Sequence, residues 1–512
     1  MHTAPHARRR IVALAASVLA ITLGVSACAT EAPAPEGSKD ATLSVAIAGA
    51  PPSLDPAALD EGQGTFIWSS IYETLLYVDN DGEIQPGVAE TYEYSEDRKT
   101  LTLGIRDGLT FSNGDALTSA DVVATLERTK VTPGAQQSRL AGVESVTAPD
   151  ESTVVIQLSA PDATFLNYLA QATGAVGHAS TLDEESNKLR PIGSGPYELA
   201  DSTVDGTTYV LERRDDYWNA DAYPYKTFTV RVISDATAVA NALQTGEILA
   251  GAVQAPQLPQ LKSAGLTTKE VTSAATMMLL LADRDGTVQP ALGDVRVRQA
   301  INMAFDRDLF VETLFAGYAR PTVESFNMNG AAYDESLADA YTYDPKAAKA
   351  LIAEAGYPDG FAVTMPSTVI STAYEAVLTQ SLADIGITVT WEPVPPQNIA
   401  SSVASAKYPM VLWLEGTNVA GREFGNYFGA EAFLNPFRYQ NDDLNALFSE
   451  IAVESDDAAR ADLYKKATAI TVDEALNAPI VSMSAIWVTS PDVVVVPDIN
   501  VPKTIRMFAP AS

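Results

Sequence analysis

The stretch Ala89–Lys130 constrains the fold more than any other part of the sequence, because its local signals specify three successive elements. Apolar side chains alternate with polar or small ones along the second half of a predicted ribbon, at Leu101, Leu103 and Ile105. The dipeptide Asn113-Gly114 is typical of a tight turn, because both residues tolerate a positive φ. Thr118 and Asp121 have the spacing of a capping box and predict a helix start. The stretch therefore predicts a ribbon, a turn and a capped helix, which form a scaffold without chemistry.

The N-terminus predicts export and lipidation. Three arginines at 8–10 precede the apolar run Ile11–Val25, which is too short to span a bilayer comfortably. The string Val25-Ser26-Ala27-Cys28 resembles a lipobox, and Cys28 is the single cysteine of the chain. We expect a signal peptide over 1–27, a lipidated Cys28 and a flexible Pro/Ala/Glu-rich tether over 28–40. The alternative is a leftover thiol beside an ordinary cleavage site.

Composition excludes several classes of function. The net charge of −32 argues against nucleic-acid binding, which needs basic patches. Of three histidines, His2 and His6 belong to the predicted signal, so a catalytic triad would need His178 specifically. Zinc sites of the usual His/Cys kind are excluded, because one histidine and no further cysteine are left for them. We expect His178 to be a surface or capping residue. We therefore expect no catalytic residue, no metal and no cofactor, and there is no Walker-type nucleotide motif.

Several strings along the mature chain occur in an order that identifies a family. They are PSLDP at 52–56, YETL at 72–75, IRDGLTF at 105–111, GSGPY at 193–197, DVRVRQAINMAF at 294–305 and YDPKAAKALIAEAGYPDGF at 343–361. Together they resemble the signatures of the family 5 extracellular solute-binding proteins, which supply peptides, nickel and some sugars to ABC importers. The string RRDDYW at 213–218 departs from the family's RNPDYW, because Arg214 and Asp215 replace Asn and Pro.

The resemblance implies an α/β, two-lobed, periplasmic-binding-protein-like fold of type II, in the large class with a small extra subdomain. Lobe I would span 41–278 with the subdomain at about 71–185, lobe II would span 279–480, and 481–512 would return to lobe I. Hinge strands are expected near Leu279–Asp283 and Pro479–Ser482.

The resemblance also implies where a ligand binds. Peptide-binding members carry a W-x-x-D stretch whose aspartate pairs with the ligand's ammonium; here Trp413 fits, but Gly416 occupies the aspartate position. Glu415 either replaces that aspartate from one residue away or is a solvated loop acid. Ala50 follows the first strand, and Phe66 either lines the pocket or belongs to the core. The expected ligand-binding residues are Ala50, Phe66, Trp413, Glu415, Gly416, Thr417 and Asn418, with Arg422, Glu423 and Tyr427 as further candidates in the following polar loop.

The sequence thus predicts an extracytoplasmic receptor that is not an enzyme. It would bind oligopeptides or dipeptides, be a monomer anchored to the outer face of the membrane by Cys28, and deliver its ligand to an ABC permease and ATPase complex. A sugar or another small solute is the alternative ligand; nickel is disfavoured because little histidine is available to a nickel chelate. A secreted hydrolase using paired carboxylates is the alternative from another class, and a signalling sensor or chaperone is a third.

Overall fold

The computed structural model describes residues 41–430 and 432–511, and all statements on structure concern these residues. The expectations for the signal peptide, the tether and Cys28 lie outside the described residues. No helix in the described part is long and apolar enough to cross a membrane.

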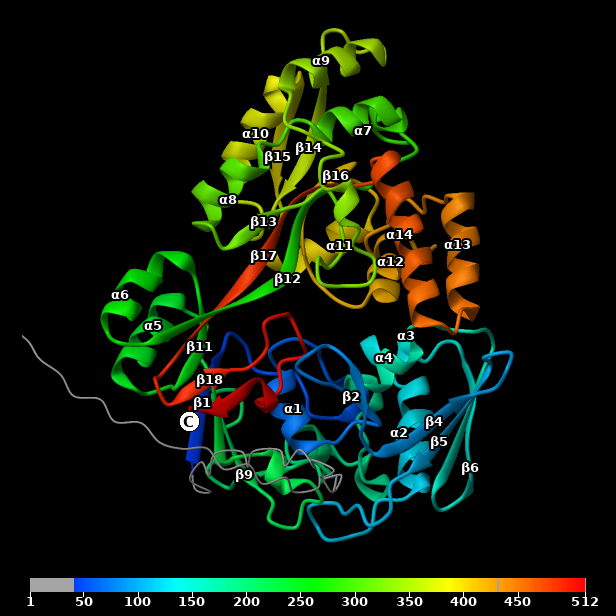
Figure 1. Cartoon of the computed structure of the whole chain (residues 1–512), viewed down its shortest axis with the longest axis vertical. Coiled ribbons are helices and arrows are strands. Elements are labelled where there is room, and N and C mark those ends of the chain that lie inside the picture. The colour runs from blue at the N-terminus through cyan, green and yellow to red at the C-terminus, as the bar shows by residue number, and fades with distance from the viewer. Residues whose placement is uncertain (1–40, 431, 512) are drawn as a thin grey trace, which may run out of the picture. The chain divides into compact units, whose positions relative to one another are not determined.

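A mixed sheet of nine strands within the described residues connects the two lobes (Figure 1). Its order is β16-β12-β17-β11-β1-β10-β9-β8, and β13 pairs with β17 beside this path. The strands are β1 (Ala41–Ile47), β8 (Tyr197–Leu199), β9 (Thr208–Arg213), β10 (Tyr225–Val232), β11 (Ala250–Val253), β12 (Thr267–Leu281), β13 (Ala319–Pro321), β16 (Met410–Gly416) and β17 (Ala478–Thr489). The strands β1, β8–β11 and the first part of β12 belong to lobe I, and β13, β16 and the last part of β12 belong to lobe II.

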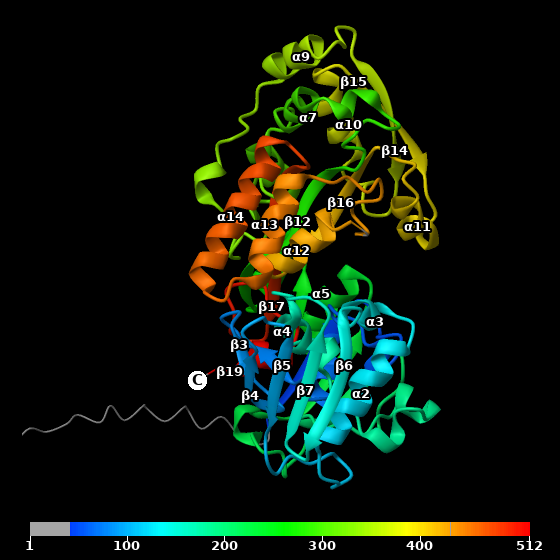
Figure 2. The same ribbon diagram turned by 90° about the vertical axis from the view of Figure 1, so that its right-hand side faces the viewer.

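The expected ribbon forms a four-stranded antiparallel sheet in lobe I, in the order β4-β5-β7-β6, with α2 lying across it (Figure 2). These strands are β4 (Ala89–Tyr94), β5 (Thr100–Ile105), β6 (Val143–Asp150) and β7 (Thr153–Leu158). The predicted turn is confirmed, because Gly114 has a φ of +87°. So is the start of α2 (Ser119–Val131), where the Asp121 carboxylate accepts the Thr118 backbone N–H at 2.9 Å.

Of the other elements of lobe I, α1 (Thr65–Ile71), α5 (Ala236–Thr245) and α6 (Leu258–Ser263) pack on strands of the nine-stranded sheet, while α3 (Ala135–Arg139) and α4 (Phe165–Leu169) lie beside α2 and the four-stranded sheet (Figure 1). Two short antiparallel pairs are formed by β2 (Leu76–Val78) with β3 (Ile84–Pro86) and by β18 (Val493–Val495) with β19 (Phe508–Pro510).

Helices and strands alternate in lobe II, where β14 (Phe361–Ser367) and β15 (Ile387–Pro393) pair in parallel. Asp344 caps α9 (Pro345–Glu354) by accepting the Ala347 N–H at 2.9 Å. The remaining helices are α7 (Val295–Asn302), α8 (Arg307–Phe315), α10 (Glu375–Asp384), α11 (Ile399–Ala404), α12 (Ala420–Phe428), α13 (Asp442–Val453) and α14 (Asp457–Asp473).

The strand β12 enters lobe II through an irregularity at Thr272–Ala274, where its register with β17 shifts between Val271 and Ala275. Ser273 lies there with a φ of +54°, a conformation unusual for a residue other than glycine. This irregularity lies earlier in the chain than the expected hinge at Leu279–Asp283. The latter segment is inside lobe II: Leu279 belongs to its core, and the buried Asp283 carboxylate accepts three backbone N–H groups.

The last residues of β12 are apolar without alternation because both faces of the strand are buried. Met277, Leu279 and Leu281 face one hydrophobic cluster of lobe II, and Met278, Leu280 and Ala282 face another. A central strand covered on both faces gives such a continuous run, which carries no signal for the place where the strand changes lobe.

Candidate functional site

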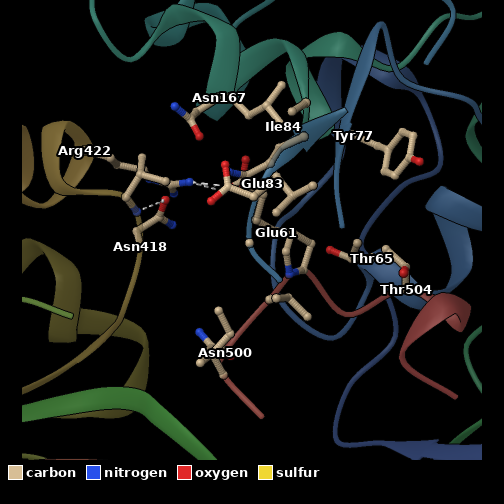
Figure 3. Close-up of a pocket in the computed structure, with 18 of the residues that line it drawn as sticks. Glu61, Thr65, Tyr77, Glu83, Ile84, Asn167, Asn418, Arg422, Asn500 and Thr504 are labelled. Carbon is tan, nitrogen blue, oxygen red and sulfur yellow. Dashed lines mark hydrogen bonds and ion pairs between the residues drawn. The ribbon is translucent and has the colours of Figure 1, made fainter. Parts of the chain in front are cut away.

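A cavity of about 990 Å³ lies between the two lobes. Lobe I contributes the loop before α1, the β2–β3 turn and the segment 499–506, and lobe II contributes the segments 415–422 and 457–464. Figure 3 shows Asn418 and Arg422 on one side of this cavity and Tyr77, Thr65 and Thr504 on the other. The volume is at the upper end of the range of about 300–1,000 Å³ that is usual for small-molecule sites.

Four of the expected residues, Glu415, Gly416, Thr417 and Asn418, line the cavity where β16 ends. Trp413 shares a strand face with Glu415 and lies behind it, with its ring centroid 5.6 Å from that of Phe433. The indole Nε1 donates to Glu415 Oε2 at 2.8 Å, and Asn426 Nδ2 donates to Oε1 at 3.2 Å. Trp413 thus orients the carboxylate of Glu415 and does not itself line the cavity.

The side chain of Glu423, which is only 2% exposed, holds the loop after β16 in place from the protein interior. Its carboxylate accepts the backbone N–H of Asn418 at 2.9 Å and that of Asn327 at 3.1 Å. Burial raises the pKa of Glu423 to about 8. Of the further candidates, Arg422 reaches the cavity, while Tyr427 is buried in the core of lobe II. Glu423 therefore positions the cavity loop from within the protein.

Ala50 and Phe66 belong to the core of lobe I. Phe66 is fully buried, edge-on to Phe228 and Trp487 and stacked on Phe508, and Ala50 packs against the same cluster. An aromatic residue on a short amphipathic helix faces either a core or a cleft, and here the adjoining sheet covers it. We therefore correct both assignments: these two residues support the cavity wall from behind.

An ion-pair cluster joins the lobes inside the cavity. Glu61 of lobe I pairs with Arg422 of lobe II (Figure 3). It also pairs with Arg139 of lobe I. Burial, and secondly the neighbouring Arg422, lower the pKa of Arg139 to about 9; burial also lowers that of Arg422. One carboxylate thus offsets two partly buried guanidinium groups. Sequence reasoning missed Glu61 because its partners are distant along the chain.

Two motif residues meet at another part of the wall. Glu73 of the YETL string lines the cavity, and its carboxylate oxygens accept from Trp218 Nε1 of the RRDDYW string at 3.0 and 3.1 Å. Burial raises the pKa of Glu73 to about 7.

Arg214, which replaces the asparagine of the family's RNPDYW string, is buried and donates to Gly195 O at 3.2 Å and to Phe111 O at 3.1 Å. Through Trp218 and Arg214, the RRDDYW string therefore connects the segments of lobe I that contain Glu73, Gly195 and Phe111.

The last wall segment, 499–506, also escaped sequence reasoning. Asn500, Lys503 and Thr504 line the cavity, and Asn500 Nδ2 donates to Thr417 Oγ1 of lobe II at 3.2 Å. His178, by contrast, caps a short helix, and its Nδ1 accepts from the Ser180 N–H at 3.3 Å, as the sequence predicted. The site as a whole offers charges of both signs and hydrogen bonds to a ligand.

Comparison with known proteins agrees with this architecture. The model of the bacterial extracellular solute-binding proteins, family 5, middle region, matches residues 83–443. The glutathione-binding protein GsiB of Shigella dysenteriae serotype 1 (strain Sd197) is 27% identical over 452 residues, covering 84% of this chain and 86% of GsiB.

Solved structures share the fold. The ABC transporter-associated periplasmic binding protein DppA from Helicobacter pylori, in complex with peptide STSA, has a TM-score of 0.77 and 24% identity and covers 92% of this chain and 98% of its own. AgaA from A. tumefaciens R10, in complex with agropinic acid, has a TM-score of 0.76 and 24% identity over 92% and 99%. From its matched residues and its two-lobed fold, this chain belongs to the bacterial extracellular solute-binding proteins of family 5.

Proposed function

We propose that this chain is the substrate-binding receptor of an ABC importer and that its ligands are short peptides. The observation that carries the proposal is the cavity between the lobes, which presents the carboxylate of Glu415 on one wall and the ammonium of Lys503 on another. A zwitterionic ligand matches such a pair of charges, because buried charges are tolerated only with partners. The similarity to GsiB, named for glutathione, and to DppA, solved with a peptide, agrees with this ligand class.

Within this function, Glu415 is the partner of the ligand's ammonium group. Both of its oxygens are oriented, by Trp413 and by Asn426, and in the described part of the chain no ion pair to Glu415 is present. Arg422, a cation in the first turn of α12, is paired with Glu61. Glu415 thus takes the role that the aspartate of the W-x-x-D stretch has in peptide-binding members.

The receptor would close by a hinge between the lobes. The expected boundaries, 41–278 for lobe I, 279–480 for lobe II and 481–512 for the return, remain a proposal, and the irregularity at Thr272–Ala274 supports a hinge slightly before the first of them. Structures with and without ligand that show no rotation about this segment would contradict the mechanism.

Anchoring and delivery complete the proposal. Signal peptide 1–27 would be removed, Cys28 would carry the lipid, and the tether would let a monomeric receptor reach its permease and ATPase complex from the outer face of the membrane. A Cys28→Ser variant expressed in the native host should appear in the medium, whereas the parent protein should stay in the membrane fraction. Equal partition of both proteins would contradict the anchor.

The ligand class is tested by native mass spectrometry of protein purified from its own host, followed by denaturation to release what it carries. Short peptides are the expected result, and Glu415→Gln should weaken their rebinding about 10- to 100-fold. The matched control is Glu392→Gln, which removes an exposed acid paired with Lys407 on lobe II and should leave rebinding unchanged. A sugar or another solute without an ammonium group would overturn the peptide assignment, and cleavage of offered peptides would favour a hydrolase.

A further inference from the structure

Lys503 is a cation of the cavity whose hydrogen-bond partners are all neutral. Its Nζ donates to Asn500 Oδ1 and, at 3.3 Å, to the carbonyl oxygen of Val501. An ammonium group has three donors, so these two contacts leave one free. Among the described residues, no carboxylate forms an ion pair with Lys503, and burial lowers its pKa to about 8.

The acids of the neighbouring elements either have partners of their own or line the cavity. On the β2–β3 turn, which contacts this segment through Asn80 Nδ2 and Arg506 O at 3.0 Å, the Asp79 carboxylate accepts the N–H groups of Asp81 and Glu83 at 3.0 and 2.9 Å. The other charged or titratable groups near the segment have their own contacts or line the cavity: Asp498 pairs with Lys269, Glu73 accepts from Trp218, Arg506 lies over Tyr77 and donates to Tyr223, and Asp81 and Glu83 line the cavity.

Asn500 connects this cation to lobe II. Its Oδ1 accepts from Lys503, while its Nδ2 donates to Thr417 Oγ1, and Thr417 in turn donates to the carbonyl oxygen of Ser273. Ser273 is the residue of positive φ at the irregularity of β12. The ammonium is therefore held in the cavity by a chain of hydrogen bonds that ends where the two lobes join (Figure 3 shows Asn500 beside this part of the cavity).

We propose that Lys503, oriented by Asn500, is a subsite for a carboxylate of the ligand. The inference rests on the proposed function, since it assigns the anionic end of a peptide whose ammonium end lies at Glu415. A carboxylate at Lys503 would take up the free donor and supply the counter-ion that the described protein lacks. Because the same chain of hydrogen bonds reaches Thr417 and Ser273, an occupied subsite also stabilises the contact between the lobes.

The test uses three peptide pools offered to ligand-stripped, refolded full-length protein and read by native mass spectrometry. The first pool is a casein hydrolysate, and the second is the same hydrolysate with every carboxyl group converted to a methylamide. The third is a set of tripeptide amides with one glutamate, which keeps a side-chain carboxylate but no C-terminal one. The variants are Lys503→Met and, as matched control, Lys407→Met, which removes an exposed lysine of lobe II.

We expect the parent protein to bind the first pool about 10- to 100-fold more tightly than the second, and Lys503→Met to lose that preference while Lys407→Met keeps it. Retained binding of the third pool would assign the subsite to side-chain carboxylates, and lost binding would assign it to the C-terminal one. Equal binding of the first two pools by the parent protein would overturn the subsite and leave the peptide receptor standing. No binding of any pool by the parent protein would overturn both.

Discussion

The cavity contains two charged regions that differ in how their charges are balanced. Around Glu61, one carboxylate meets two guanidinium groups, one from each lobe, so the region is largely balanced by the protein itself. At Lys503 and Glu415, the hydrogen-bond partners are neutral side chains and backbone groups. The first region therefore stabilises the contact of the lobes. In the second region, the charges of Lys503 and Glu415 have no counter-ion among the described residues and are available to a ligand.

This difference predicts that removing a charged group has opposite effects on the free energy of unfolding in the two regions. Removing a partner from a balanced, partly buried ion pair leaves an uncompensated charge and costs free energy. Removing a buried charge that has no counter-ion relieves a desolvation cost and stabilises the folded state. Four substitutions test this contrast.

Glu61→Gln should lower the free energy of unfolding by about 2–4 kcal/mol, because Arg139 and Arg422 would then face each other without a carboxylate. Urea denaturation at neutral pH measures the loss. An unchanged midpoint would show that the cluster does not hold the lobes together.

Lys503→Met should raise the free energy of unfolding at pH 7 by about 1–3 kcal/mol. Burial lowers the pKa of Lys503 from 10.5 to about 8 in the folded protein, so the folded state loses this proton before the unfolded chain does. The stability of the parent protein should therefore rise between pH 8 and 10.5, and the advantage of the variant should disappear there. Thermal unfolding at pH 7 and pH 10 checks this; a variant less stable than the parent at pH 7 would contradict the missing counter-ion.

Glu324→Gln tests a buried acid of lobe II that has no ion-pair partner among the described residues. Glu324 is 1% exposed, one of its oxygens accepts the Asp334 N–H at 3.0 Å, and burial raises its pKa from 4.5 to about 7. The parent protein should lose stability as the pH rises from 4.5 through 7, and the variant should lose less, by about 1–2 kcal/mol at pH 8. Denaturant midpoints at pH 5 and pH 8 measure the difference, and identical pH slopes would refute the assignment.

The smallest effect is expected for Asp205→Asn, which breaks the exposed pair of Arg190 and Asp205 on lobe I. Solvent screens such pairs, so the change should stay within about 0.5 kcal/mol. It is the control for Glu61→Gln, and a loss of similar size in both variants would remove the distinction between the two kinds of charge.

Much of the fold follows from local signals in the sequence. The tight turn at Gly114 and the capping box of Thr118 and Asp121 lie where short-range patterns predict them. The wall from Glu415 to Asn418 follows from the resemblance to the family's W-x-x-D stretch, in which Trp413 takes the place of the tryptophan. These features depend on neighbours within a few residues.

The missed features depend on tertiary neighbours. Glu61 and Arg422, and likewise Asn500 and Thr417, meet only after the chain has folded, and no local pattern links them. The sequence leaves Phe66 open between the pocket and the core, because an amphipathic helix does not show which neighbour its apolar face meets; the structure buries it against the sheet. The positive φ of Ser273 cannot be predicted from the sequence, because glycine, the usual residue in that conformation, is absent at this position.

The pairing of β17 with β11, β12 and β13 has a consequence for the order of folding. The strand β17 begins at Ala478, so the sheet that joins the lobes forms only after nearly the whole chain is available. Long-range pairing of this kind is slow, because a large loop must close before its contacts form. A chain that must cross a membrane unfolded would benefit from this order of folding, because the sheet shared by the two lobes cannot form before β17 has crossed.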